Sequence, residues 1–255
     1  MGILNVTPDS FSDGGLWQDI DKAIYHAQSM IDEGADIIDV GGESTRPDFI
    51  NISINEEIDR VMPVIEALHK RFDIPVSIDT SKSQVAKAAI LAGASMVNDI
   101  WGLKHDPEMS KIIAENNVAC CLMHNRKMIN YTNFIMDVHD DLRQSVNIAL
   151  NAGIASDKII LDPGIGFAKT YEMNLEIINL LDIIIDIGYP VLLGASRKSF
   201  IGKALDLPVH ERIEGTLTTT VIAVMRCCSF VRVHDVKENK RVITMTEAII
   251  NSEGI

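Results

Sequence analysis

The polar residues best suited to chemistry stand at the ends of eight short apolar runs in the sequence. They are Asn5, Asp39, Asp79, Asn98 with Asp99, His124, Asp162, Ser196 to Lys198, and Arg232 with His234. Among them, Asp79, Asp162 and Asn98 have the acceptors and donors that bind the edge of a planar heterocycle. A buried carboxylate needs a partner, and a ligand with two parallel N–H groups would supply one, as an arginine does. We therefore expect these three side chains to form a ligand site if the fold brings them together.

Cationic side chains form a second group. Arg46, Lys198, Arg232 and His234 all stand near the end of an apolar run, and Thr45 adds a hydroxyl beside Arg46. Arg232 and His234 alternate with valines, which places both on the same side of an extended strand. Two cations inside a protein require an anion, so this group predicts a site for an anionic ligand. Taken singly, such residues would also fit a turn, a helix N-cap or a solvated surface charge.

The segment from Thr7 to Gly15 is too long and too polar for a simple turn. It is either a lid over a bound substrate or a disordered connection. Phe11 favours the lid, to which Asp13 would also belong. No zinc site is indicated, because His124 and His234 stand in different runs and lack the spacing of zinc ligands.

The apolar runs predict the strands that carry these residues. They are Ile3–Val6, Ile37–Val40, Val76–Asp79, Met96–Asp99, Val118–His124, Lys158–Asp162, Val191–Ala195 and Phe230–Asp235. The intervening segments carry apolar residues at helical spacing. Gly34, Gly93 and Gly153 stand where such helices would end. Pro63 lies inside the second helical segment and predicts either a kink or a late start of that helix.

Eight strand and helix pairs of about 30 residues each use the whole length of 255 residues. We therefore expect one domain over residues 1–255, in the α/β class. Nearly continuous apolar strands with crossover helices indicate a parallel sheet, and eight units favour closure into a (β/α)8 TIM barrel. The alternative is an open doubly wound sheet, but no G-x-G-x-x-G turn follows the first strand. In a barrel, all the strand ends described above would lie on one catalytic rim.

Composition excludes several classes of protein. The chain has 23 Lys and Arg against 36 Asp and Glu, a net charge of −13, and 47% hydrophobic residues, so it can bury a sizeable core. Its scattered cations do not form the basic face that a nucleic-acid-binding protein needs. No run is long and apolar enough to cross a membrane, and the first residues do not resemble an export signal. The adjacent pairs Cys120-Cys121 and Cys227-Cys228 favour reduced thiols with half of each pair facing a core, so we expect a cytoplasmic protein.

Over essentially its whole length the chain resembles the dihydropteroate synthases, which belong to the pterin-binding enzymes. The motifs that carry the resemblance are GILNVTPDSFSDGG at 2–15, GGESTRP at 41–47, IDT at 78–80, ND at 98–99, MH at 123–124, LDPGIGF at 161–167, SRK at 196–198 and RVHDV at 232–236. The first and the sixth are highly specific. Residues 127–131 follow no pattern of the family, and Asp48 stands where glycine commonly follows the Thr-Arg-Pro motif.

The resemblance implies a barrel that forms a homodimer and a transferase of folate biosynthesis, the target of sulfonamides. Its members join 6-hydroxymethyl-7,8-dihydropterin diphosphate to 4-aminobenzoate and release diphosphate with the help of Mg²⁺. We expect dissociative C–O cleavage followed by attack of the amine, without a protein nucleophile. The family match implies that Asp79, Asn98, Met123, Asp162 and Lys198 hold the pterin and that Thr45, Arg46, Arg232 and His234 hold the diphosphate. It also implies that Pro47, Phe167, Arg197 and Ser199 shape the aminobenzoate site and that Asn5 contacts the metal ion.

Two other functions remain open at this point. A corrinoid-type methyltransferase would share the barrel and the pterin site but would have no diphosphate to hold, so Arg46 and Arg232 argue against it. A pterin-binding barrel without catalysis would show damaged anion or loop motifs, and here these motifs are intact.

Overall fold

The computed structural model describes residues 1–7, 16–43 and 52–252, and for residues 16–19 only the backbone. Thr45, Arg46, Pro47, Phe11 and Asp13 therefore lie outside the described residues. The strands are β1 (Gly2–Asn5), β2 (Ile38–Gly41), β3 (Val76–Asp79), β4 (Met96–Asp99), β5 (Ala119–Met123), β6 (Ile159–Asp162), β7 (Leu192–Leu193) and β8 (Phe230–Val231). The helices are α1 (Leu16–Asp32), α2 (Ile54–Arg71), α3 (Ser83–Leu91), α4 (Met109–Asn116), α5 (Phe134–Asn151), α6 (Tyr171–Asn179), α7 (Leu181–Ile185), α8 (Ser199–Leu205), α9 (Ile213–Met225) and α10 (Val236–Ile250). Two short 3₁₀ helices are η2 (Ser156–Lys158) and η3 (Val209–Glu211).

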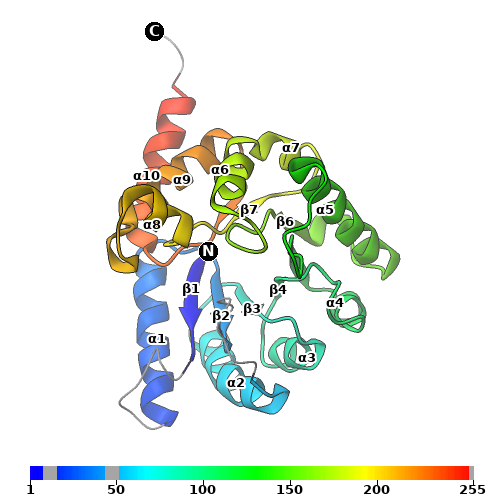
Figure 1. Cartoon of the computed structure of the whole chain (residues 1–255). Coiled ribbons are helices and arrows are strands. Elements are labelled where there is room, and N and C mark those ends of the chain that lie inside the picture. Colours follow the sequence, from blue (N-terminus) through cyan, green and yellow to red (C-terminus); the bar gives the residue numbers. More distant parts are fainter. Residues whose placement is uncertain (8–15, 44–51, 253–255) are drawn as a thin grey trace.

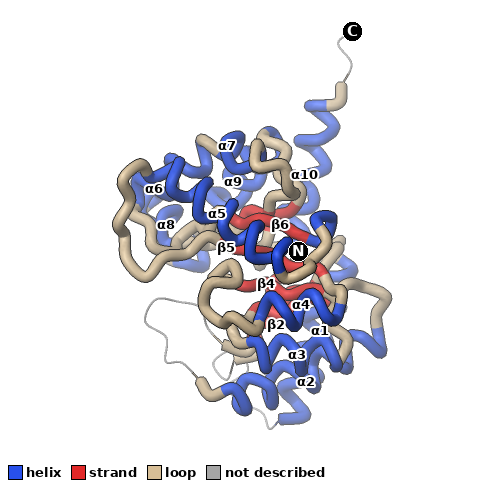
Figure 2. The backbone as a smooth tube through the Cα atoms, turned by 90° about the vertical axis from the view of Figure 1, so that its right-hand side faces the viewer, coloured by secondary structure: helices blue, strands red, loops and turns tan. Residues whose placement is uncertain are grey.

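In the part of the chain that the structure describes, eight strands close into a parallel barrel. Strands β1 to β6 form one sheet in chain order, and β7 pairs with β8. Single bridges join Leu161 to Val191 and Gly2 to Val233, where Ile3 N donates to the Val233 carbonyl at 3.0 Å. The helices lie outside this ring of strands (Figures 1 and 2). The predicted (β/α)8 barrel is confirmed, and the open doubly wound sheet is wrong because the first and last strands meet.

The strands have a core on each face, because side chains along a strand alternate in direction. Outward side chains such as Leu4, Ile78 and Leu122 pack beneath the helices in the larger core. A smaller cluster fills the amino-terminal end of the barrel interior, with Met1, Met96, Cys121, Ile160 and Leu192. The prediction that one cysteine of each pair faces a core is wrong for the first pair, because Cys120 and Cys121 are both buried, each in a different core. In the second pair, Cys227 is exposed and Cys228 is half-buried. All four cysteines are free thiols.

The helix ends follow the sequence signals. Gly34, Gly93 and Gly153 each adopt a left-handed conformation, with φ of 97°, 116° and 92°, just after α1, α3 and α5. Helix α2 begins well before Pro63. At its start, Ser53 Oγ accepts from the backbone N–H of Glu56 at 3.2 Å. The late start considered for this helix is therefore wrong, and Pro63 lies inside it. Within the described residues, no helix combines the length and apolar character needed to cross a bilayer.

Candidate active site

Arg232 joins two carboxylates at the carboxyl ends of the strands. Its Nε donates to Asp39 Oδ2 at 2.6 Å, and its Nη2 donates to Asp79 Oδ2 at 2.7 Å. Asn98 Nδ2 donates to the same oxygen of Asp39 at 3.1 Å. Asp39 is fully buried, and Asp79 and Asn98 are 6% and 4% exposed. The side chains carried by β2, β3, β4 and the end of β8 thus form one polar network inside the barrel mouth.

Some buried oxygens of this network lack a hydrogen-bond partner among the described residues. They are Oδ1 of Asp39, Oδ1 of Asp79 and the hydroxyl of Ser77, which is paired in register with Asp39. A buried carboxylate oxygen without a donor is costly, so such an oxygen indicates a ligand or an ordered water molecule in the barrel mouth.

Strand β6 and the loop that follows it complete the lining of the interior. Asp162 Oδ1 accepts from the backbone N–H of Gly164 at 2.7 Å. Met123 is buried and is paired in register with Asp162. Lys198 places its Nζ 4.3 Å from the centroid of the Phe167 ring, a cation–π contact. Asp162, Lys198, Met123 and Phe167 therefore face one side of the same interior.

Charge in this interior is unevenly balanced. Burial raises the pKa of Asp79 to about 7 even though Arg232 opposes the shift, and burial also raises the pKa of Asp162. Burial and then Arg232 lower the pKa of Lys198 to about 8. Burial alone would lower the pKa of Arg232, but Asp39 and Asp79 raise it, so this guanidinium stays charged. Among the described residues that face this interior, the carboxylates Asp39, Asp79 and Asp162 lie against the cations Arg232 and Lys198, an arrangement that suits a ligand with N–H donors or developing positive charge.

His234 does not contribute a second inward cation to the described network. Its Nδ1 lies 2.9 Å from Ser196 Oγ. Burial, with help from Arg197 and Arg232, lowers the pKa of His234 to about 4. His234 is therefore neutral at pH 7 without a ligand. Arg232 and His234 therefore do not form the predicted pair of inward cations that needs an anion, because His234 is neutral and Arg232 already has two carboxylate partners.

Arg197 and Ser199 lie at the edge of the site. Arg197 Nε donates to Asp235 Oδ2 at 3.0 Å, which ties the loop after β7 to the loop after β8. Ser199 is the first residue of α8 and is exposed. Both side chains therefore border the barrel mouth on the side of Lys198, which caps the same helix.

The residues around Asn5 fit a hard cation. Asn5, Gly41 and Asp79 are neighbours in register across β1, β2 and β3. A Cβ added at Gly41 would lie 3.5 Å from Asn5 Oδ1 and 3.9 Å from Asp79 Oδ2. Because Gly41 has no side chain, space is left between these two oxygens, and the Asn5 side chain is exposed. Mg²⁺ takes oxygen ligands and keeps several waters, so an exposed amide oxygen at the rim suits it.

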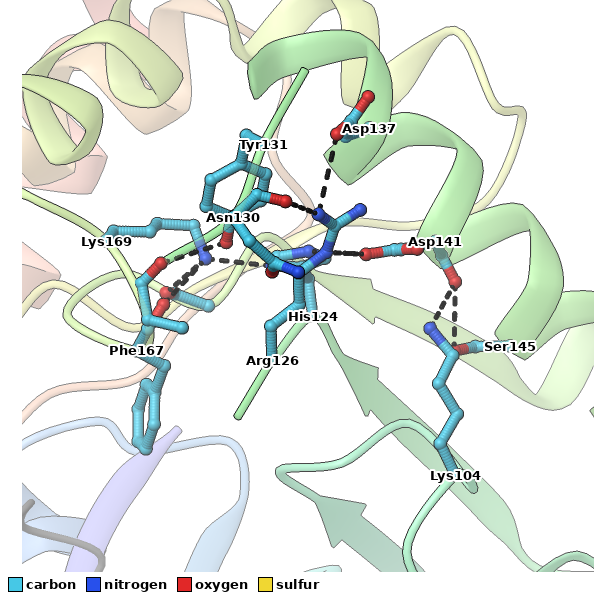
Figure 3. A network of polar contacts seen from close by, with 12 residues as sticks. Lys104, His124, Arg126, Asn130, Tyr131, Asp137, Asp141, Ser145, Phe167 and Lys169 are labelled. Atoms are coloured by element: carbon cyan, nitrogen blue, oxygen red, sulfur yellow. Dashed lines mark hydrogen bonds and ion pairs between the residues drawn. The ribbon is translucent and has the colours of Figure 1, made fainter. Parts of the chain in front are cut away.

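Several residues that support the site are not among the predicted site residues. Asp39 and His124 stand at predicted strand ends without a predicted role, and Lys169 and Asp141 are not predicted at all. Figure 3 shows the network around His124, in which Lys169 lies between His124 and the carbonyl groups of the loop after β6. A charged residue inside the apolar run Ile37–Val40 was a usable signal for Asp39. No periodicity pointed to Lys169, because its partners are 45 and 5 residues away.

The chain is similar over nearly its whole length to known proteins of one family. The family model described as "Pterin binding enzyme" matches residues 1–234. The dihydropteroate synthase of Clostridium beijerinckii is 61% identical over 98% of this chain and 93% of its own, and that of Bacillus subtilis is 55% identical over 100% and 90%. Among solved structures, the dihydropteroate synthase of Clostridium difficile in the presence of pteroic acid has a TM-score of 0.96 and 49% identity, covering 99% of this chain and 96% of that one. The Xanthomonas albilineans enzyme with 4-aminobenzoic acid has a TM-score of 0.95 and 37% identity, covering 99% and 93%. The chain therefore belongs to the pterin-binding enzyme family, among the dihydropteroate synthases.

Proposed function

We propose that the protein joins 6-hydroxymethyl-7,8-dihydropterin diphosphate to 4-aminobenzoate, giving 7,8-dihydropteroate and diphosphate. The observation that carries the proposal is the buried network of Asp39, Asp79, Asn98 and Arg232, in which two carboxylate oxygens have no donor among the described residues. A pterin ring has N–H donors along one edge and fits such acceptors.

Asp162 is the proposed anchor of the pterin edge. Its Oδ1 already accepts from the Gly164 N–H, which leaves Oδ2 for the ligand. A Cβ added at Gly194 would lie 3.4 Å from that Oδ2, so glycine keeps the oxygen accessible. Asn98, Asp79, Lys198 and Met123 complete the proposed ring site, since all of them border the same interior.

The proposed reaction breaks the C–O bond before the amine attacks. The pterin methylene group then carries positive charge that spreads into the ring. The carboxylates of Asp39, Asp79 and Asp162 stabilise that charge without rearranging at the moment of reaction. The pKa of Asp79 is about 7 without a ligand, and positive charge on the ring would lower it and favour the ionised carboxylate. The aminobenzoate nitrogen then forms the new bond to the methylene carbon, and no side chain has to act as a nucleophile.

Arg232 and His234 would receive the departing diphosphate. Arg232 Nη1 has two N–H donors and no acceptor among the described residues, so it remains free to bind phosphate. An approaching phosphate would raise the pKa of His234 and allow the imidazole to take a proton. Mg²⁺ held by Asn5 would add positive charge for the leaving group. Thr45 and Arg46, outside the described residues, complete this part of the proposal.

Phe167, Arg197 and Ser199 would line the aminobenzoate site, together with Pro47. The segment with Phe11 and Asp13 would keep water from the cation.

We further propose that residues 1–255 form a single domain and that the protein acts as a cytoplasmic homodimer. Sedimentation of the purified protein would test the dimer, and a monomer at micromolar concentration would contradict it.

The test of the function is a diphosphate-release assay with and without 4-aminobenzoate, in which the arylamine should increase net release because it captures the methylene cation. Lys198→Ala and Arg232→Ala should each lower the rate at least tenfold, because each removes a charged contact worth about 1.5–3 kcal/mol. Lys203→Ala, at a position 64% exposed, is the matched control and should keep the wild-type rate. Wild-type rates in both Lys198→Ala and Arg232→Ala would overturn the site assignment.

A further inference from the structure

The loop after β6 has an unusual backbone. We call residues 163–168 the β6 loop. Within it, Gly164, Gly166 and Ala168 all have left-handed conformations, with φ of 73°, 83° and 44°. For a residue with a side chain, such as Ala168, this conformation is unfavourable. The β6 loop therefore needs contacts from outside to hold it in one shape.

Two side chains behind the β6 loop supply these contacts. Lys169 Nζ donates to the carbonyl oxygens of Gly164 at 2.9 Å and Phe167 at 3.1 Å. Tyr131 Oη donates to the carbonyl oxygen of Ala168 at 2.9 Å. Three carbonyl groups of one short loop thus accept hydrogen bonds from two side chains. Tyr131 comes from the segment 127–131, which follows no family pattern in the sequence.

The third acceptor of the Lys169 ammonium is a histidine. Lys169 Nζ lies 2.9 Å from His124 Nδ1, and His124 Nε2 lies 3.1 Å from Asp141 Oδ2. An ammonium has only donors, so Nδ1 must accept and Nε2 must carry the proton that Asp141 accepts. Arg126 Nε donates to the same Asp141 oxygen at 2.6 Å. His124 is fully buried and Lys169 is 9% exposed, so this chain of contacts is fixed inside the protein (Figure 3).

The opposite side of the β6 loop faces the proposed pterin site. Gly164 connects the two sides, because its N–H donates to Asp162 Oδ1 at 2.7 Å while its carbonyl accepts from Lys169. Phe167 also connects the two sides. Its ring centroid lies 4.3 Å from Lys198 Nζ, and its carbonyl oxygen accepts from Lys169. We propose that the Lys169 ammonium, oriented by His124, is the positioning residue that holds Asp162 and Phe167 in place for the pterin ligand. This inference rests on the proposed function.

The positioning depends on the charge of Lys169. Burial lowers the pKa of Lys169 to about 7, and Asp162 opposes this shift. The titratable and charged groups that face it from the surrounding elements are His124, Arg126, Tyr131, Asp141, Asp162 and Lys198. The ammonium has three donors for its three acceptors, whereas the neutral amine has two. As the pH rises through the pKa of Lys169, one of its three hydrogen bonds is therefore lost and the β6 loop is fixed less firmly.

The test compares pteroate binding to wild type and to Lys169→Met by calorimetry between pH 6 and pH 9. At pH 6 the variant should bind at least tenfold more weakly, because contacts from a charged donor are lost. The ratio of the two dissociation constants should then fall by pH 9, where wild-type Lys169 is neutral and keeps only two of its three donors. The titration of Asp79 occurs in both proteins and cancels in the ratio, because Lys169 is not among the charges that shift its pKa.

Tyr131→Phe is the matched control, because it removes a hydrogen bond to the same β6 loop without removing a charge. Burial raises the pKa of Tyr131 to about 12, so any loss of affinity should not vary between pH 6 and pH 9. Lys111→Met, at a position 61% exposed on α4, should bind pteroate as wild type does. A ratio for Lys169→Met that stays constant with pH would show a purely structural role and overturn the inference.

Two variants of His124 keep the inference testable if Lys169→Met does not fold. His124→Asn retains an acceptor oxygen where Nδ1 stood, whereas His124→Leu removes it and should lower the pKa of Lys169. Pteroate binding by His124→Leu should therefore weaken at a lower pH than binding by His124→Asn. Identical pH profiles for the two variants would contradict the inference. If wild type itself fails to bind pteroate at any pH, the proposed function fails, and the inference fails with it.

Discussion

The guanidinium of Arg232 and the carboxylate of Asp39 form an ion pair inside the barrel, with 2.6 Å between Nε and Oδ2. The two residues are 193 positions apart in the sequence. The Asp39 side chain has no exposed surface, and that of Arg232 is 17% exposed. Breaking a buried pair leaves an uncompensated charge, which costs far more than losing a pair on the surface.

Asp39→Asn should therefore lower the free energy of unfolding by about 3 kcal/mol. Asp36→Asn is the matched control three positions earlier, because the Asp36 side chain is 77% exposed in its pair with Lys240. The control should lose less than about 1 kcal/mol. Urea unfolding followed by circular dichroism measures both. Equal losses in the two variants would show that the buried Asp39–Arg232 pair stabilises the fold no more than the exposed Asp36–Lys240 pair does.

The raised pKa of Asp79 predicts a fall in stability with rising pH. Its pKa rises from 3.8 to about 7 through burial, with Arg232 opposing the shift. The native state thus holds a proton that the unfolded chain releases at lower pH. This contribution is complete below pH 3.8 and is lost as the pH rises through about 7. Its full size is on the order of 4 kcal/mol.

Unfolding of wild type and Asp79→Asn across pH 4 to 8 checks this sign, because asparagine does not titrate. Wild type should lose stability relative to the variant over this range. Parallel stability curves would contradict the raised pKa.

Gly164→Ala should disrupt the β6 loop. Gly164 has a φ of 73°, and a Cβ there would overlap with the carbonyl oxygen of His124. Gly188 also has a left-handed φ, at 92°, but an added Cβ meets nothing within 4 Å. Gly188→Ala should cost only the backbone strain of about 1–2 kcal/mol and leave pteroate affinity unchanged. Gly164→Ala should cost more and also weaken pteroate binding, and matching results for the two variants would rule out the overlap.

Lys82→Met should destabilise the fold through Glu57. The Glu57 carboxylate has no exposed surface, and Lys82 Nζ lies 2.6 Å from its Oε2. Without the ammonium, the buried carboxylate keeps the Thr80 hydroxyl, at 2.7 Å, as its only donor among the described residues. We expect a loss of about 3–5 kcal/mol in the free energy of unfolding. Lys70→Met breaks a pair in which the lysine is 73% exposed and should cost less than about 1 kcal/mol.

If Asn5 holds the proposed Mg²⁺, Asn5→Ala should raise the Mg²⁺ concentration that gives half-maximal diphosphate release by about tenfold, because one oxygen ligand of the metal ion is lost. Pteroate has no diphosphate group, so its binding should not change in this variant. Titration of Mg²⁺ into chelator-treated protein measures the first effect and calorimetry the second. An unchanged Mg²⁺ requirement would remove Asn5 from the metal site.

Much of the fold follows from local patterns. The strands at Val76–Asp79 and Met96–Asp99 have the predicted bounds, and the glycines after α1, α3 and α5 end helices as expected. The last two strands are much shorter than predicted: β8 covers only Phe230–Val231 of the run Phe230–Asp235. After Val231 the chain still pairs, through the bridge from Val233 to Gly2, but no longer as a regular ladder, and an apolar run does not reveal where a regular ladder ends.

The sequence by itself determined the class of the fold, the family and the rim on which Asp79, Asn98 and Asp162 meet. Those conclusions rest on period and motif, which are local properties of the chain. Only the tertiary structure decided that Arg232 is bound by Asp39 and Asp79 and that Lys169 holds the β6 loop. Burial and charge pairing set both arrangements, and each depends on residues that become neighbours only when the barrel closes.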